Sequence, residues 1–222
     1  MNFKYALFDM DGTLLDSMSL WREGLLEYIR NRYGCIKHDA DFSAEIINRS
    51  TRAGVALYKT RYTDDDTPDD VIIEIIRENT HNGYKRGCPV KPGAEKLIRH
   101  YNGCGVKTCL FTATPRFMVD DALKASKLDA HFDLIFTCDK PALSKEHTLG
   151  FETALRELGA ESVKEAILFE DALYSIKTAK SLGIYTVGVY DEYSKYDAEK
   201  IKETADEYHS SLDGFCKAHG IE

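Results

Sequence analysis

The chain has 222 residues, of which 43% are hydrophobic and 30% charged, and this composition is typical of a globular protein rather than a disordered one. Lysine and arginine number 29 against 37 acidic residues, giving a net charge of −8, and the sequence contains no basic stripe or tail. Because nucleic-acid binding depends largely on neutralising phosphates, these features argue against a nucleic-acid partner. An acidic protein that binds an anionic substrate needs local positive charge or a bound cation.

Two further features of the chain bear on its location. No segment approaches the roughly 20 apolar residues of a membrane span, and the start, MNFKYALFDMDG, lacks the long apolar stretch and cleavage site of a signal peptide. The six cysteines are scattered without a C-x-x-C pair, as is typical of reduced thiols. We therefore expect a cytoplasmic protein with no membrane partner, either a monomer or a weak homodimer.

Short apolar runs rich in β-branched and aromatic residues predict strands at 3–9, 106–112, 133–138, 166–171 and 185–190. Helical sequences separate the last four of these runs. Thr114 and Pro115 predict the start of one helix, and two others are expected over 144–159 and 171–183. Continuous apolar strands that alternate with helices predict a parallel sheet covered on both faces. The predicted fold class is α/β with a Rossmann-like core.

A long stretch without a convincing strand separates the first two predicted strands. The apolar spacing of LWREGLLEYIRNRYG predicts a helix, VIIEIIRENTHNGYKRG predicts another, and the segment 40–62 predicts further helices. The acidic run DDDTPDD lacks the spacing and glycine of a calcium loop, and it predicts solvated acids at a helix N-terminus. We therefore predict a helical insertion, residues 16–87, in a discontinuous core formed by residues 1–15 and 88–222.

Acidic residues lie at the ends of two predicted strands. Asp9 and Asp11 follow the first strand, and Glu170 and Asp171 end the fourth. Because ligands of open α/β sheets bind outside the carboxyl ends of the strands, we expect these four acids to meet at one edge. Crowded carboxylates repel one another, which implies a counterion. Oxygen ligands without histidine or cysteine favour a hard cation, so we expect Mg²⁺.

These residues also carry a family resemblance. The segments DMDGTLLDS, LFTAT and FEDALYSIKTAKSLG, together with Lys145, resemble in order and spacing the four motifs of the haloacid dehalogenase-like (HAD) hydrolase superfamily. The helical insertion is similar to the C1-type cap of its phosphoglycolate phosphatase and β-phosphoglucomutase-like members. The resemblance implies a Mg²⁺-dependent phosphohydrolase that cleaves a small phosphate monoester through an aspartyl-phosphate intermediate.

The resemblance assigns catalytic and metal-binding roles. It makes Asp9 the nucleophile and Asp11 the general acid and base, and a spacing of two puts both side chains on one side of an extended strand end. The implied metal ligands are Asp9, Asp11 through its carbonyl, Asp171, and Glu170 through water. Asp171 has an alternative role as the cap of the helix that follows.

The resemblance also implies a set of phosphate-binding residues, namely Met10, Gly12, Thr112, Ala113 and Lys145. Gly12 allows a sharp turn and a close approach of the backbone to phosphate. Thr112 is expected to donate to a phosphoryl oxygen, and Lys145 to neutralise charge as part of the catalytic set. Lys140 is the alternative lysine because a proline follows it, as in the family pattern, whereas the distance from Lys145 to FED fits better.

Three functions stay open at this level. The first is a phosphatase, the second a phosphomutase of the β-phosphoglucomutase type, and the third an idle binding or regulatory protein on the same fold. The presence of every core motif residue favours an enzyme. Within the insertion, Asp16 and Ser17 are expected to start the first helix, and Trp21 is expected either to face substrate or to pack internally. No motif in the insertion identifies the small phosphorylated metabolite.

Overall fold

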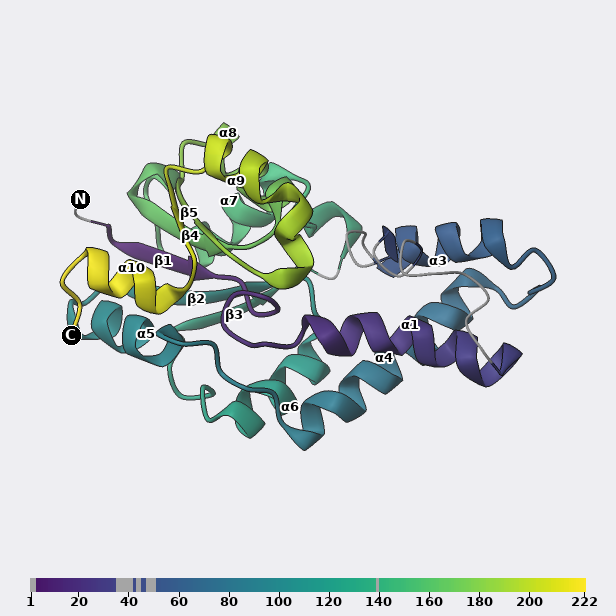
Figure 1. Ribbon diagram of the computed structural model, residues 1–222. Helices are drawn as coiled ribbons and strands as arrows, with labels where there is room; N and C mark the ends of the chain where they lie inside the picture. The colour runs from purple at the N-terminus through teal and green to yellow at the C-terminus, as the bar shows by residue number, and fades with distance from the viewer. Residues whose placement is uncertain (1–2, 35–41, 43–44, 47–50, 139) are drawn as a thin grey trace. The chain divides into compact units, whose positions relative to one another are not determined.

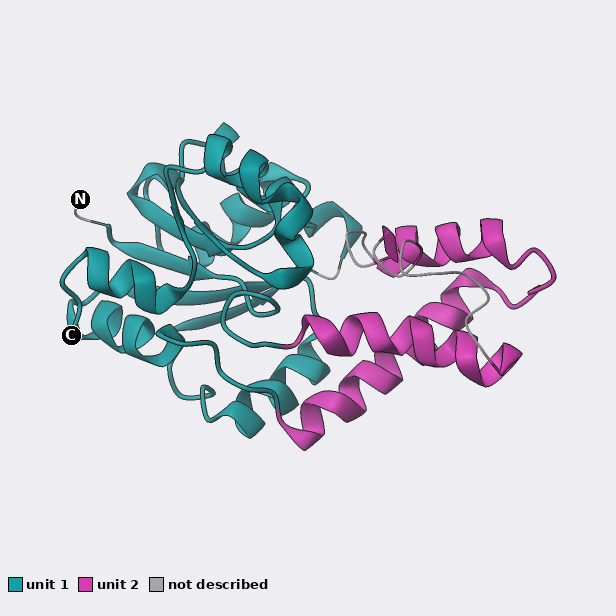
Figure 2. Ribbon diagram, viewed as in Figure 1, with its two compact units in different colours: residues 1–16, 88–222 teal, residues 17–87 magenta. Residues whose placement is uncertain are grey.

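The computed structural model describes residues 3–34, 42, 45–46, 51–138 and 140–222. The chain divides into two compact units, which Figure 2 shows in different colours. The first, the core unit, comprises Met1–Asp16 and Cys88–Glu222, and the second, the helical unit, comprises Ser17–Gly87. Within the described residues, none of the helices combines the length and apolar character needed to cross a bilayer.

The core unit is built on a parallel sheet, which has six strands among the described residues in the order β3-β2-β1-β4-β5-β6 (Figure 1). The strands are β1 (Tyr5–Phe8), β2 (Lys107–Thr112), β3 (Leu134–Thr137), β4 (Ala166–Glu170), β5 (Tyr185–Val189) and β6 (Glu207–His209). The first five lie within the predicted runs, so the α/β, Rossmann-like prediction is confirmed. β6 was not predicted, because a half-buried Glu-Tyr-His edge strand carries no apolar run.

Helices cover both faces of this sheet. They are α5 (Ala94–Gly103), α6 (Arg116–Ser126), α7 (Thr148–Glu157), α8 (Leu173–Ser181), α9 (Ala198–Thr204) and α10 (Leu212–Ala218), with short 3-10 turns η1 (Pro141–Leu143), η2 (Val163–Glu165) and η3 (Glu192–Asp197). Figure 1 shows α7, α8 and α9 on one face and α5, α6 and α10 on the other. The crossover helices α5 and α6 thus cover one face and α7, α8 and α9 the other, so both faces of the sheet are buried.

Burial on both faces explains why the strands read as continuous apolar runs. Leu7 and Leu168 point into a buried cluster with Phe151 of α7. Their neighbours Phe8 and Phe169 stack on each other, with ring centroids 5.1 Å apart, on the opposite face. Every residue of β1 is buried as a result. A strand with two apolar faces loses the alternation that marks a half-buried strand.

The predicted starts of three core helices are wrong, because each helix begins later than expected. Pro115 is the N-cap of α6 and not its first helical residue, and α7 begins after Ser144, at Thr148. Ala172 precedes α8, so Asp171 does not cap it. The residues between each strand end and the following helix form loops instead, and these loops carry the side chains of the site described below.

The helical unit contains α1 (Met18–Tyr33), α3 (Thr51–Arg61) and α4 (Asp69–Arg86), and α4 packs against the other two. A Cβ atom on Gly83 would lie 2.6 Å from Leu20 Cδ2, so the absence of a side chain allows α1 and α4 to approach closely. Trp21 packs internally, where its indole nitrogen donates to the Tyr84 hydroxyl at 2.9 Å. Within the predicted helical segment 40–62, α3 forms one helix, and residues 40–41, 43–44 and 47–50 lie outside the described residues.

Asp65 contradicts the prediction that the acidic run is solvated. Asp65 is only 4% exposed, and its carboxylate accepts hydrogen bonds from the hydroxyls of Tyr28, at 2.7 Å, and Tyr58. The Thr67 amide donates at 2.9 Å and Arg32 lies 3.1 Å away. Burial alone would raise the pKa of Asp65, but the hydrogen bonds from Tyr58, Thr67 and Tyr28 outweigh it and lower the pKa below 3.8.

We expect Asp65→Asn to lower the free energy of unfolding by about 3 kcal/mol at neutral pH, because it removes the charge that these donors surround. A lowered pKa stabilises the fold fully above the unfolded-state value of 3.8, and this contribution is lost as the pH falls toward the folded-state value. The difference from wild type should therefore shrink below pH 3.8. Urea unfolding followed by circular dichroism measures it.

Asp66→Asn is the matched control, because its side chain is fully exposed beside the same arginine. It should change the free energy of unfolding by less than about 0.5 kcal/mol. Equal effects of the two substitutions would contradict a structural role for the Asp65 network.

Candidate active site

Two contacts with the end of β4 and the residue after it shape the loop that follows β1. The Asp9 amide continues the sheet by donating to the Phe169 carbonyl at 3.0 Å, which places Asp9 beside the end of β4. Gly12 has a φ of +88°, and a Cβ atom there would lie 2.6 Å from Asp171 Oδ2. Because a larger residue would be strained in the left-handed region and would collide with this carboxylate, glycine is required here.

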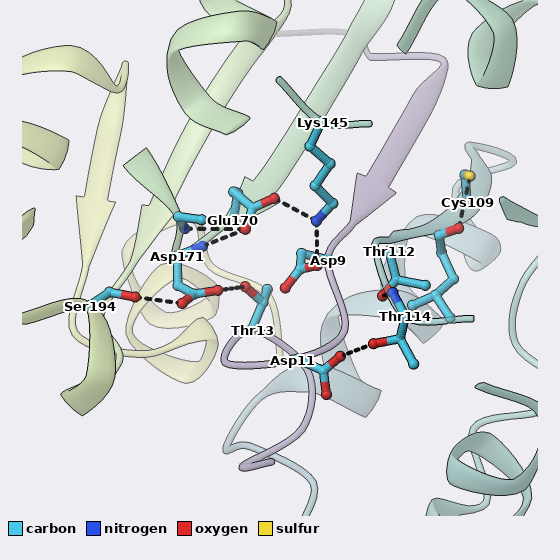
Figure 3. A network of polar contacts seen from close by, with 12 residues as sticks. Asp9, Asp11, Thr13, Cys109, Thr112, Thr114, Lys145, Glu170, Asp171 and Ser194 are labelled. Carbon is cyan, nitrogen blue, oxygen red and sulfur yellow. Dashed lines mark hydrogen bonds and ion pairs between the residues drawn. The ribbon is translucent and has the colours of Figure 1, made fainter. Parts of the chain in front are cut away.

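Three carboxylates meet at the carboxyl ends of β1 and β4. Oxygens of Asp9, Glu170 and Asp171 lie within 4.8 Å of one another, and all three residues are at least 95% buried. Figure 3 shows the Lys145 ammonium between two of them, where it pairs with Asp9 and lies 2.8 Å from Glu170 Oε2. Lys145 is itself 3% exposed, whereas the alternative lysine, Lys140, is exposed. The structure thus brings Lys145 to the carboxylates.

The charges of this cluster do not balance. Burial and the neighbouring Glu170 carboxylate raise the pKa of Asp9 well above its usual range, although Lys145 opposes the shift. Burial, Glu170 and Asp191 raise the pKa of Asp171 to about 7. Burial would lower the pKa of Lys145, but Asp9 and Glu170 outweigh it and raise that pKa. Three carboxylates facing one ammonium group leave a net negative charge that a divalent cation would neutralise.

The carboxylate oxygens are oriented by neighbouring donors. Thr13 Oγ1 donates to Asp171 Oδ1 at 3.1 Å, and Ser194 Oγ in η3 donates to Oδ2 at 2.7 Å (Figure 3). The amides of Asp171 and Ala172 donate to Glu170 Oε1, both at 3.2 Å. These hydrogen bonds fix the orientation of the Asp171 and Glu170 carboxylates. In metal sites, residues that hydrogen-bond to the metal ligands orient them in the same way.

Asp11 lies apart from the three clustered carboxylates. Its Oδ2 accepts a hydrogen bond from the Thr114 hydroxyl at 2.6 Å, and Thr112 Oγ1 accepts from the Thr114 amide at 3.1 Å (Figure 3). Thr112 is the last residue of β2 and is 1% exposed. The loop after β2 therefore holds the second aspartate of the first motif, and Thr114 serves this contact rather than the helix cap predicted for it.

The other predicted phosphate-binding residues flank these groups. Met10 is fully buried, so its side chain lies in the core, and Ala113 is exposed in the loop after β2. Lys91 binds the backbone of Gly12. Its ammonium group donates a hydrogen bond to the Gly12 carbonyl and lies 2.8 Å from Asp191 Oδ2. The loop backbone is consequently anchored to the region after β5.

Sequence reasoning missed the residues that orient the site. Thr13 follows Gly12 directly, so its place in the first motif was an available signal. Ser194 and Lys91 lie in segments far from every motif and have no distinctive local sequence. Only the folded chain brings them to Asp171 and to the Gly12 carbonyl.

The donor set fits a hard divalent cation. Carboxylate oxygens from Asp9, Glu170 and Asp171 converge, and no imidazole or thiolate of the residues that the structure describes belongs to the cluster. Oxygen-only sets are typical of Mg²⁺, which keeps several waters and uses a few carboxylates. The backbone carbonyl of Asp11, which the resemblance adds as a ligand, belongs to the same loop.

Comparisons with known proteins agree with this architecture. Over 201 residues the chain is 28% identical to validoxylamine A 7′-phosphate phosphatase of Streptomyces hygroscopicus subsp. limoneus, covering 90% of this chain and 91% of that protein. Over 189 residues it is 26% identical to the pyrophosphatase PpaX of Bacillus cereus (strain AH820), covering 85% and 84%. The crystal structure of CbbY from Rhodobacter sphaeroides with phosphate shares the fold, with a TM-score of 0.78, 22% identity and 95% coverage of both chains.

The family model for haloacid dehalogenase-like hydrolases matches residues 6–189, which include both strand ends that contribute to the carboxylate cluster. On this match, together with the sheet order and the site, the chain belongs to the haloacid dehalogenase-like hydrolase family and is an enzyme of that family.

Proposed function

We propose that this hydrolase is a Mg²⁺-dependent phosphatase that cleaves a small phosphate monoester through an aspartyl-phosphate intermediate. The observation that supports it most directly is the convergence of Asp9, Glu170 and Asp171 with Lys145 at one edge of the sheet. The phosphatase names of the two sequence relatives point the same way. Neither name identifies the substrate of this chain.

In this proposal, Asp9 is the nucleophile. Its carboxylate attacks the phosphorus atom, the leaving oxygen departs, and a phosphate is left esterified to Asp9. Asp11 protonates the leaving oxygen and then takes a proton from the water that hydrolyses the ester. The Thr114 hydroxyl donates to the Asp11 carboxylate and so fixes the position of this side chain.

Lys145 and Thr112 bind the transferring group. Lys145 neutralises charge on Asp9 and on a phosphoryl oxygen, and the Thr112 hydroxyl donates to another oxygen. The amides around Gly12 and Ala113 and the turn at Met10 complete the phosphate-binding loop. Positioning and charge stabilisation are the main demands of phosphoryl transfer, and these groups supply both.

The proposed Mg²⁺ ligands are Asp9 and Asp171, the Asp11 carbonyl, and Glu170 through water. When bound, the ion would offset the repulsion between the carboxylates and the incoming phosphate. Ser194 and Thr13 hold Asp171 in the orientation that this role needs. We further propose that the helical unit, residues 17–87, is the cap that selects the substrate.

The test is phosphate release from phosphorylated compounds by the purified chain. Sugar phosphates, phosphoglycolate, nucleotides, inorganic pyrophosphate and p-nitrophenyl phosphate form the panel. We expect turnover with Mg²⁺, a fall of at least about 100-fold when EDTA removes the metal, and recovery when Mg²⁺ is restored. Turnover that is insensitive to EDTA would contradict the metal site.

The fate of the phosphoryl group separates the remaining alternatives. Release of inorganic phosphate, followed by ³¹P NMR, supports the phosphatase, whereas transfer to another position of a sugar phosphate would show a mutase. Absence of turnover on the whole panel by a folded protein would favour the idle binding protein.

A further inference from the structure

A second group of potential metal ligands lies in the core unit on residues that the proposed reaction does not use. Ligand atoms of Glu207, His209 and His219 lie within 4.8 Å of one another. Glu207 and His209 are two apart on β6, so their side chains project from the same face of the edge strand. His219 follows α10, which brings the third group from a different element.

The separations within this group suit cis ligands of one ion. His209 Nε2 and His219 Nε2 each lie 2.8 Å from the same carboxylate oxygen, Glu207 Oε2. Two ligands about 2.1 Å from a metal stand about 3.0 Å apart at a right angle and about 3.4 Å apart at the tetrahedral angle typical of Zn²⁺. An ion could therefore replace the two ring protons after shifts of a few tenths of an ångström.

Neighbouring side chains hold the three ligands in this arrangement. The Tyr185 hydroxyl donates to the other carboxylate oxygen, Glu207 Oε1, at 2.9 Å. The ring of Phe215, which is 3% exposed, stacks on His219 at 4.2 Å and meets His209 edge-on at 5.3 Å. These contacts fix the carboxylate and both imidazole planes, as outer residues of metal sites do.

We propose that Glu207, His209 and His219 form a binding site for one divalent transition-metal ion of the Zn²⁺, Co²⁺ or Ni²⁺ class. Two imidazoles and one carboxylate select this class, whereas the all-oxygen cluster at the ends of β1 and β4 selects Mg²⁺. The His219 side chain is 42% exposed, so an ion has access from solvent and water completes its coordination. The ion ties the edge strand β6 to the end of α10 and stabilises the folded core unit.

The test is calorimetric titration of the full chain, without a histidine tag, with Zn²⁺ in excess Mg²⁺, which keeps the carboxylate cluster occupied. We expect binding by wild type and at least about tenfold weaker binding by His209→Gln and by His219→Gln. Co²⁺ should give visible d–d absorption that both variants lose. Saturating Zn²⁺ should also raise the midpoint of thermal unfolding of wild type by about 5 °C. It should leave the midpoints of both variants unchanged.

His131→Gln is the matched control, because this histidine is partly exposed in the same unit and its side chain is not part of the cluster. It should bind Zn²⁺ like wild type. Circular dichroism without metal checks the fold of each variant, and His219→Gln, at the more exposed position, decides the matter if His209→Gln is misfolded. Absence of Zn²⁺ binding by wild type, or undiminished binding by a folded His219→Gln, would overturn the proposal.

Discussion

Asp9→Asn is expected to lower kcat by about 10⁵-fold, because it removes the proposed nucleophile while leaving a side chain of the same size in the cluster. Asp9 is buried beside Lys145 and continues β1 into the site, so the substitution should not disturb the strand. Steady-state phosphate release with Mg²⁺ measures the effect. Acid quenching during turnover should trap a phosphorylated protein in wild type and none in the variant.

Asp16→Asn is the matched control for this experiment. Asp16 lies in the same loop region and is exposed, so its charge should change kcat less than about twofold. Turnover of Asp9→Asn at the wild-type rate would remove the nucleophile assignment. Loss of turnover with an undiminished phosphorylated intermediate would assign Asp9 to a later step instead.

Lys145→Met is the second substitution with a large expected effect. It should lower kcat/KM by about 10³-fold, because Lys145 is the charged donor buried among the carboxylates. Without Mg²⁺ it should also lower the free energy of unfolding by about 3–5 kcal/mol, since Asp9, Glu170 and Asp171 would remain buried without a cation. Urea unfolding with and without Mg²⁺ measures this, and the loss should be smaller with the metal.

Lys140→Met separates the two lysines that the sequence left as alternatives. Its side chain is exposed and it precedes the 3-10 turn η1. We expect wild-type stability and a change in kcat/KM of less than about twofold. A large loss of activity in Lys140→Met with little change in Lys145→Met would reverse the assignment.

The parts of the fold that sequence predicted well are those in which burial dictates residue type. β1, β2, β4 and β5 could be predicted because strands covered on both faces are mostly apolar and buried along their length. β6 could not, since among the described residues it pairs with β5 alone and its half-buried residues are polar. Helix starts failed where a capping residue had another use, as with Thr114, which binds Asp11.

The same distinction applies to the site and to the acidic run. Asp9, Asp11, Glu170 and Asp171 were candidates because acids at strand ends have no structural use in a sheet. Their orienting partners come from loops distant in the chain, and nothing local marks a serine or lysine for that purpose. Asp65 was predicted to be solvated because its tyrosine partners come from two other helical segments that only folding brings near.

The central place of β1 has a consequence for biosynthesis. β1 precedes the other described strands in the chain, yet its neighbours in the sheet are β2 and β4, and β4 ends at Glu170. Residues 17–87 find their partners within the same segment, so they can fold while the apolar YALF strand still lacks both. A nascent chain that stops before β4 carries Asp9 but neither Glu170 nor Asp171. The carboxylate cluster is therefore complete only after β4 has been synthesised, and until then the apolar first strand lacks one of its two neighbours in the sheet.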